Sequence, residues 1–345
     1  MQLSKILEII LRLAVFAAVS VWAGSCLGQQ YCVTDLGMVV PTHNSSIAIG
    51  VNSAGQVTGE SSGPGELSQR GFRWEDGVMT DLGALPGNTG SWGRGINNPG
   101  QVVGSSNGPQ PPHAFLWEDG VMTDLGTLPG HEGSWALQIK DSGQAVGYSG
   151  YVPAGHFVGR AVLWAGGEPK NLGTLPGHAY SAALAINNFG QVAGYSCLFG
   201  GPPRNCNAFL WEEGVMTDLG GLLGRTYTIA YGINNAGEVV GESNPNRLAR
   251  GSAFVYSKGV MSELENLPGE SFSSAYAIND GGQIAGNSGD RAVIWTGGII
   301  ADLNDLIPPD TGWVLRYAYG INDAGQIVGQ GWINGEKHAF LLTPN

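Results

Sequence analysis

The amino-acid sequence predicts an all-β fold, a seven-bladed β-propeller of four-stranded antiparallel blades. Three observations support this prediction: one ten-residue phrase occurs seven times, it returns every 43 to 47 residues, and each interval contains four short strand patterns. Repeats of this period are supersecondary units that bury their faces by stacking on their neighbours. One glycine in each copy anchors the alignment: Gly55, Gly100, Gly143, Gly190, Gly237, Gly282 and Gly325.

The first strand of each repeat alternates small residues with larger ones, as in residues 48–52 and 230–234. Alternation with a period of two is typical of a strand. An Asn-x-Gly turn follows, for example Asn98-Pro99-Gly100. Glycine in third place predicts a type II turn, which requires a positive φ at that residue.

Three more strands complete each repeat. The second reads Gln-Val-Val-Gly, and the third reads Ala-Phe-Leu-Trp, as in residues 114–117 and 208–211. A tight Glu-Asp-Gly turn at residues 75–77 precedes a fourth strand, whose Val-Met-Thr-Asp-Leu pattern recurs at residues 121–125. Four short strands joined by tight turns are the pattern of one propeller blade.

The two ends of the chain complement each other. The last repeat stops after its third strand, and residues 31–37 match the fourth-strand pattern of residues 77–83. We therefore expect the N-terminal strand, residues 31–37, to complete blade seven and to leave no sheet edge exposed at the seam. Residues 29–345 are expected to form this single domain, and an open solenoid is the alternative fold.

The N-terminal segment has the pattern of a secretory signal peptide. Residues 1–28 contain Lys5 and Arg12, then an apolar stretch over residues 13–23, then small residues. This predicts an extracellular or cell-envelope location, with no membrane span after signal removal. An uncleaved anchor and a lipoprotein box at residues 23–26 are the alternatives.

Composition excludes several classes of partner. The chain has 345 residues, 42% hydrophobic and 13% charged, with 57 glycines, which is typical of a strand-rich and turn-rich fold. Its net charge of −12 opposes phosphate backbones and anionic lipid heads. We therefore expect no nucleic-acid partner, and instead an extracellular carbohydrate or protein bound by a monomer.

The cysteines suggest one disulfide. Cys197 and Cys206 bracket a Gly-Gly-Pro-Pro loop and can bridge its base in an oxidising compartment. Cys26 is expected to leave with the signal peptide. A buried apolar thiol is the expected state of Cys32, which lies in a predicted strand.

The third-strand motif points to a family. His113-Ala114-Phe115 and His338-Ala339-Phe340, together with Gly-Ile-Asn-Asn-x-Gly-Gln and Asp-Leu-Gly-x-Leu-Pro-Gly, resemble the HAF repeat of predicted bacterial extracellular proteins. The resemblance covers residues 31–345. It implies secretion and a repeat fold, and it implies no particular reaction or catalytic residue. The histidine position is occupied differently in four repeats, by Arg160, Asn207, Ser252 and Arg291.

Binding is expected on one face of the propeller. Connections alternate between the two ends of an up-and-down blade, so the loops between second and third strands share a face with the crossovers between blades. These connections vary in length and composition, and variable loops on a rigid scaffold are where binding sites commonly occur. An aromatic residue precedes or opens the first strand in six repeats: Trp92, Trp135, Tyr180, Tyr227, Phe272 and Trp313.

These aromatics are candidate ligand-binding residues, since flat rings near a channel mouth can stack on sugars or peptides. The alternative is that they wedge between blades as core. Polar candidates on the same face are His156, Arg160, Arg250 and Trp332.

Catalytic motifs are weak. The six histidines include no pair three to five residues apart, so no local metal-ligand set and no cofactor is expected. The repeated aspartates Asp35, Asp81, Asp124 and Asp218 are expected to form strand-end hydrogen bonds, because a residue repeated in each unit usually answers a repeated structural need. We therefore expect a non-catalytic binding or scaffold protein. The alternative is a polysaccharide hydrolase, or a lyase that uses cationic groups around the channel mouth.

Overall fold

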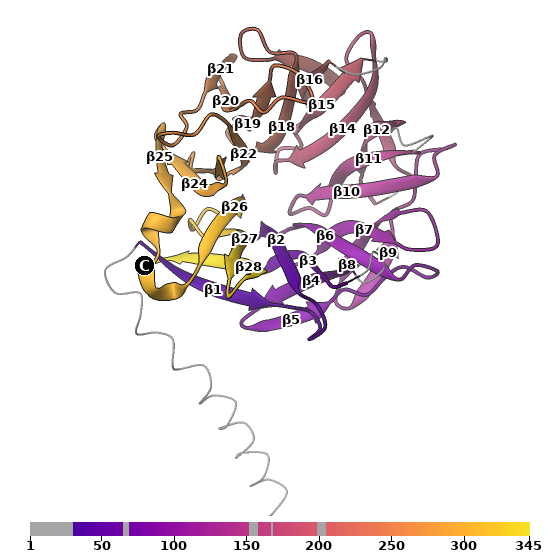
Figure 1. The fold of residues 1–345 in the computed structure, drawn as a ribbon. Coiled ribbons are helices and arrows are strands. Elements are labelled where there is room, and N and C mark those ends of the chain that lie inside the picture. Colours follow the sequence, from indigo (N-terminus) through magenta and orange to yellow (C-terminus); the bar gives the residue numbers. More distant parts are fainter. Residues whose placement is uncertain (1–29, 65–68, 152–157, 167, 199–204) are drawn as a thin grey trace, which may run out of the picture.

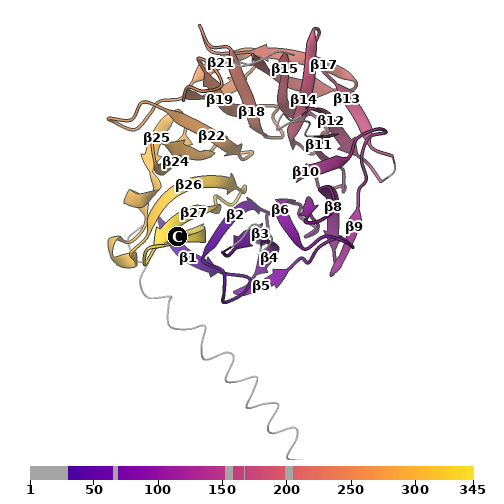
Figure 2. The same ribbon diagram turned by 45° about the vertical axis from the view of Figure 1, so that its right-hand side comes forward.

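The computed structural model describes residues 30–64, 69–151, 158–166, 168–198 and 205–345. These residues form β-strands and two short 3-10 helices. Most strands pair with their neighbours in the chain to give four-stranded antiparallel units, and the units stand side by side around a common centre (Figures 1 and 2). The expected signal peptide, residues 1–28, lies outside the described residues.

The first units follow the predicted strand order. One unit contains β2 (Ser45–Val51), β3 (Val57–Ser62), β4 (Arg70–Glu75) and β5 (Val78–Asp81). The next contains β6 (Gly90–Ile96), β7 (Val102–Asn107), β8 (His113–Glu118) and β9 (Val121–Asp124). The third contains β10 (Gly133–Ile139), β11 (Ala145–Tyr151), β12 (Val158–Trp164) and β13 (Lys170–Gly173). In each of them, the first strand lies nearest the centre (Figure 2).

The remaining units repeat this plan. The fourth contains β14 (His178–Ile186), β15 (Val192–Leu198), β16 (Cys206–Glu212) and β17 (Val215–Gly220). The fifth contains β18 (Tyr227–Ile233), β19 (Val239–Asn244), β20 (Ser252–Ser257) and β21 (Val260–Glu263). The sixth contains β22 (Ser273–Ile278), β23 (Ile284–Ser288), β24 (Arg291–Thr296) and β25 (Ile299–Asp302). Two 3-10 helices, η3 (Leu303–Leu306) and η4 (Pro309–Thr311), lead to β26 (Val314–Ile321), β27 (Ile327–Ile333) and β28 (Glu336–Pro344).

The N-terminal strand β1 (Tyr31–Gly37) pairs antiparallel with β28, at the other end of the chain. Val33 lies opposite Leu342, and Asp35 lies opposite Phe340. Figure 1 shows this indigo strand against the yellow C-terminal strands. The first and last segments of the domain therefore share one sheet, as the sequence pattern predicted.

The two kinds of tight turn have different geometries. Glu75 pairs with Val78 across a two-residue loop in which Asp76 (φ 48°) and Gly77 (φ 83°) both have positive φ. Two positive φ values define the type I′ turn that suits a twisted hairpin. The turn after the first strand corrects the type II prediction. Gly100 (φ 87°) ends a three-residue loop whose hydrogen bonds run from Gly100 N to Asn97 O and from Asn97 N to Gln101 O.

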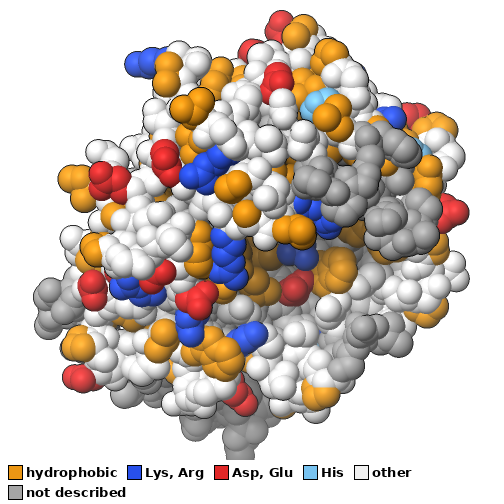
Figure 3. Space-filling model, turned by 45° about the horizontal axis from the view of Figure 1, so that its top comes forward, with side chains coloured by type: hydrophobic (Ala, Val, Ile, Leu, Met, Phe, Trp, Pro, Cys, Tyr) orange, Lys and Arg blue, Asp and Glu red, His pale blue; other side chains and the backbone are white. Residues whose placement is uncertain are grey.

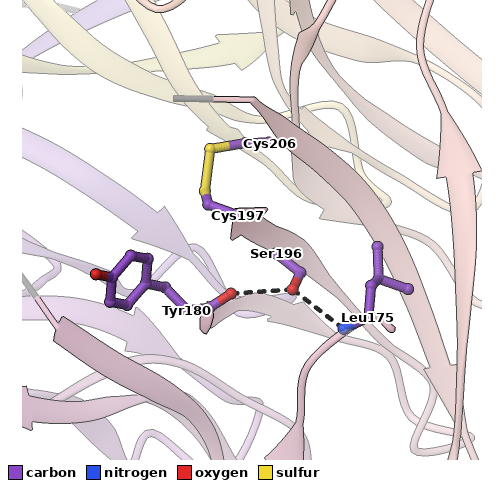
Figure 4. Close-up of a disulfide and its surroundings, with 5 residues drawn as sticks. All are labelled: Leu175, Tyr180, Ser196, Cys197 and Cys206. Atoms are coloured by element: carbon purple, nitrogen blue, oxygen red, sulfur yellow. Dashed lines mark hydrogen bonds between the residues drawn. A yellow bond between two sulfur atoms is a disulfide. The ribbon is translucent and has the colours of Figure 1, made fainter. Parts of the chain in front are cut away.

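In five units a repeated serine forms hydrogen bonds with the crossover that leads into the unit. Ser196 Oγ accepts a hydrogen bond from Leu175 N at 3.1 Å and donates one to Tyr180 O at 2.9 Å (Figure 4). Four other serines accept from the matching leucine amide: Ser106, Ser149, Ser243 and Ser288. This satisfies buried amides that no strand can pair. The repeated serine is therefore structural.

Asparagines link the units at the end of the molecule that carries the three-residue turns. Asn52 Nδ2 donates to Asn97 O at 2.9 Å, and Asn97 Nδ2 donates to Lys140 O at 3.2 Å. The same bond joins Asn187 to Asn234, Asn234 to Asn279, Asn279 to Asn322, and Asn322 to Asn52. Each asparagine is buried. The series is broken only at Lys140, among the described residues.

Candidate functional site

The innermost strands surround a central cavity of about 410 Å³, which is lined by residues of β2, β6, β10, β14, β18, β22 and β26. Each of these strands carries a β-bulge at the same place, for example between Ala136 and Gln138 in β10. A bulge re-aims the extra side chain. The bulged residues all line the cavity: Ile49, Arg94, Leu137, Leu184, Tyr231, Tyr276 and Tyr319.

Close backbone contact explains the glycine that faces each bulge. A Cβ on Gly147 would lie 1.9 Å from the carbonyl oxygen of Trp135 on the neighbouring strand. No side chain fits there. The glycine that closes the repeated phrase is therefore required by the packing of the two inner strands.

One side of the cavity wall is aromatic. The ring centroids of Tyr231 and Tyr276 are 5.5 Å apart, and those of Tyr276 and Tyr319 are 5.0 Å apart. Tyr317 stacks on Tyr319 at 5.7 Å with an interplanar angle of 17°. We call these four residues the tyrosine arc. Their rings are partly buried, so they offer flat apolar surface beside polar hydroxyls.

Burial raises the pKa values of these tyrosine hydroxyls. Desolvation raises the pKa of Tyr319 to about 12, and it raises the pKa of Tyr276 and Tyr231 further. Desolvation also raises the pKa of Tyr148, which stacks on Trp135 at 4.9 Å, to about 12. All four hydroxyls are therefore protonated at neutral pH and able to donate hydrogen bonds.

A partly buried ion pair adjoins the arc. Arg94, the one cation among the bulged residues, lies with Nη2 at 3.6 Å from Glu60 Oε2. That distance is too long for a hydrogen bond, and Oε2 is buried with no hydrogen-bond partner. Desolvation raises the pKa of Glu60, although the nearby Arg94 charge opposes this effect.

Glu242 occupies the same position in another repeat, and its surroundings are different. Its carboxylate accepts hydrogen bonds from Tyr231 Oη at 3.0 Å, Asn244 Nδ2 at 3.1 Å and Ser274 Oγ at 2.7 Å. It therefore anchors one end of the tyrosine arc.

A second pocket, of about 310 Å³, lies beside the arc and shares Tyr276 and Tyr317 with it. Glu242, Arg247, Arg250 and Phe272 are among its lining residues. We call it the arginine pocket. Figure 3 shows a hollow on one face of the molecule, with Lys and Arg side chains gathered around it and hydrophobic side chains inside.

The structure separates the six predicted crossover aromatics. Tyr180 and Tyr227 pack with Cys197 and Cys206, and Trp313 packs edge-on to Phe340 against the core of the last unit. Trp135 stacks on Tyr148. Trp92 donates its Nε1 hydrogen to Gln69 Oε1 at 2.7 Å, beneath the Arg94 guanidinium at 5.5 Å.

Arg250 and Phe272 are the two predicted site residues that share a pocket, with the Arg250 guanidinium 4.2 Å from the Phe272 ring centroid. Trp332 lies in another pocket with Lys337, whose ammonium is 5.4 Å from its ring. Arg160 donates to the backbone carbonyls of Gly159 and Ala179. His156 lies outside the described residues.

Cys197 and Cys206 form a disulfide between β15 and β16, with Cα atoms 4.1 Å apart (Figure 4). It closes the base of the loop between these strands, where the sequence suggested a bridge. The prediction of a buried thiol at Cys32 is wrong, because Cys32 is disulfide-bonded. The strand pattern around Cys32 contained no signal for this bond.

The repeated aspartates have structural partners. Asp124 Oδ1 accepts from Gly126 N at 2.8 Å, and its other oxygen lies 2.8 Å from His113 Nδ1. In four more units the same carboxylate position contacts the residue at the position of His113: Arg70 with Asp81, Asn207 with Asp218, Arg291 with Asp302, and His338 with Asp35. The histidine of the repeat motif therefore joins the third strand of a unit to its outermost strand.

Sequence reasoning missed the tyrosine arc, Arg94, Glu60 and Glu242. A signal was present: the residue two places before Ile or Val in each Gly-Ile-Asn phrase varies between aliphatic, basic and aromatic types. Its neighbours in the phrase hardly change. Variation at one position of an otherwise constant repeat is expected where the residues at that position contact a ligand.

No group of three or more His, Cys, Asp or Glu side chains among the described residues is arranged to hold a metal ion. Within the same residues, no helix has the length and hydrophobicity needed to span a membrane.

Comparison with known proteins places the fold in a class. No family model and no curated protein matches the chain. Among solved structures, the chain is similar to YCF48 bound to a D1 peptide, with a TM-score of 0.56 and 13% identity over 93% of this chain and 97% of that one.

The β-propeller domain of the trilobed protease from Pyrococcus furiosus aligns with a TM-score of 0.53 and 8% identity, over 88% of this chain and 97% of that one. A puromycin-hydrolysing peptidase of Mycobacterium tuberculosis aligns with a TM-score of 0.55 and 13% identity, over 86% of this chain and 52% of that one. At these identities the similarity shows the fold alone. The protein is an all-β propeller.

Proposed function

We propose that this propeller is an exported, non-catalytic binding protein with seven blades in a closed ring, and that the mouth of its central cavity binds a carbohydrate polymer. Two contacts between the ends of the chain support closure: β1 pairs with β28, and Asn322 bonds to Asn52. The seven bulged residues around one cavity support the blade count. The signal-peptide pattern and the HAF-like motifs support export.

The tyrosine arc is the observation that carries the binding proposal. Its four partly buried tyrosines lie in a contacting row: Tyr231, Tyr276 and Tyr319 line the cavity, and Tyr317 stacks on Tyr319. Aromatic faces stack on the apolar faces of sugar rings, while hydroxyls, Arg94 and Glu242 supply polar contacts. A row of rings suits an extended polymer better than a compact ligand.

A polysaccharide hydrolase is the second candidate, and one observation favours it. The raised pKa of Glu60 is what a general acid needs, and Glu60 forms an ion pair with Arg94, which lines the cavity. A structural role also explains the position of Glu60, because its Oε2 pairs with Arg94. Binding without turnover is therefore the proposed function.

Binding assays with a panel of acidic and neutral polysaccharides, and with peptides, test the proposal. Tyr319→Ala should weaken polymer binding by about tenfold, because it removes one stacking ring from the arc. Tyr319→Phe keeps the ring and is the matched control, so it should bind almost as the wild type does.

Three results would contradict the proposal. New reducing ends or unsaturated products, abolished by Glu60→Gln, would establish an enzyme. Binding of peptides alone would assign a protein partner. Equal binding by the two Tyr319 variants would remove the arc from the site.

A further inference from the structure

Arg247 and Arg250 line the arginine pocket and have no carboxylate partner in the part of the chain that the structure describes; of the other described arginines only Arg160 also lacks one, and it donates to the backbone carbonyls of Gly159 and Ala179. Among the described residues, six arginines form ion pairs with carboxylates: Arg70, Arg73, Arg94, Arg225, Arg291 and Arg316. Within the same ranges, Arg247 and Arg250 form none, although both line one pocket. In a chain of net charge −12, two neighbouring arginines without carboxylate partners provide a local site for an anion.

Side-chain to backbone hydrogen bonds fix the conformation of the loop that carries these arginines. Asn246 Oδ1 accepts hydrogen bonds from Leu248 N at 2.9 Å and Ala249 N at 3.1 Å. This turn places Arg247 and Arg250 on one short loop between β19 and β20. The Arg250 guanidinium also lies over the Phe272 ring, and such stacking leaves its edge hydrogens available to a planar carboxylate.

The pocket also contains hydrogen-bond acceptors. Asn244 and Asn287 line it, and the side-chain oxygen of each is buried with no hydrogen-bond partner. Glu242 adds a carboxylate on the same wall. Cationic donors beside neutral and anionic acceptors match a ligand that carries both a carboxylate and hydroxyl groups.

We propose that the arginine pocket binds the carboxylate of a uronic-acid residue, so that the polymer recognised by this protein is an acidic polysaccharide. This inference rests on the proposed function, because the pocket shares Tyr276 and Tyr317 with the tyrosine arc. A chain stacked on the arc reaches Arg247 and Arg250 with a neighbouring sugar. An acidic peptide offers the carboxylate without the hydroxyl groups that the acceptors suit.

The test compares polyuronates with the neutral polymers made from them by carboxyl reduction. Wild-type protein should bind each polyuronate at least tenfold more tightly than its reduced partner, and added salt should reduce the difference. The variant R247A/R250A should bind both forms equally, with the wild-type affinity for the neutral form. Lys337→Ala removes a positive charge from another pocket, so it is the control for general electrostatics and should keep the preference.

The outcomes separate the two proposals. Equal wild-type affinity for acidic and reduced polymers would overturn the uronate assignment and leave polysaccharide binding in place. Binding of neither form would overturn both proposals. A preference that survives in R247A/R250A would also overturn the assignment, provided that thermal unfolding shows the variant to be folded.

Discussion

Asn322 donates a hydrogen bond from its side-chain Nδ2 to the backbone carbonyl of Asn52 at 2.8 Å, across 270 residues of sequence. The same side chain accepts from Gln326 N at 2.9 Å, so one buried amide serves its own turn and the neighbouring unit. Five other asparagines do the same. The bond from Asn322 is the member of this series that joins the end of the chain to its beginning.

We expect Asn322→Ala to destabilise the protein by about 2 kcal/mol, because it leaves the Gln326 amide without its partner and leaves the Asn52 carbonyl with the bond from Gly55 N alone. Asn279→Ala is the matched control, since Asn279 makes the same bonds within the chain interior. Urea unfolding should give costs that agree within about 0.5 kcal/mol. A cost for Asn322→Ala that is about 1 kcal/mol smaller would indicate that the seam is open.

Lys140 interrupts the asparagine series, and we expect its replacement to stabilise the fold. Lys140→Asn places an acceptor near Gln144 N and a donor near Asn187 O, as in the other units. The gain should be about 1 kcal/mol in the free energy of unfolding. Lys140→Gln removes the same charge and cannot form the same short turn. Equal stability of these two variants would show that charge removal alone is responsible.

Glu60 should make stability depend on pH. The pKa of Glu60 is raised in the folded state. Its contribution to the free energy of unfolding is therefore fully present in acid, and it is lost as the pH rises through and above the usual pKa of 4.5. Glu60→Gln should therefore reduce the fall in unfolding free energy between pH 4 and pH 7. Arg94→Gln should move the fall to higher pH, because the Arg94 charge lowers the Glu60 pKa. Identical pH profiles for wild type and Glu60→Gln would contradict this account.

The repeat made the strand order predictable because each unit solves the same packing problem with the same residues. Period-two alternation identified the inner strands, and the match between residues 31–37 and 77–83 predicted the partner of β1. Aspartate repetition correctly pointed to strand-end hydrogen bonds, as Asp124 and Gly126 show.

The candidate site was harder to predict because bulges decide where its side chains point. Alternation alone does not reveal a bulge, so Tyr231, Tyr276 and Tyr319 were not recognised as residues that line the same cavity. Trp313 was a candidate because it is aromatic and near a crossover, yet its surroundings are core. Bringing Arg250 to Phe272 required a loop geometry that Asn246 sets.

The central claim, that the N-terminal strand completes the last blade, is tested most directly by amide hydrogen exchange of residues 32–35. Their register against residues 340–343 places them within an antiparallel pair. Because β1 pairs with β28 alone, alternate amides in this segment face the partner strand, and we expect those amides to be protected as strongly as the paired amides of β28. Unprotected exchange at residues 32–35, while β27 and β28 remain protected, would show that β1 does not belong to the sheet.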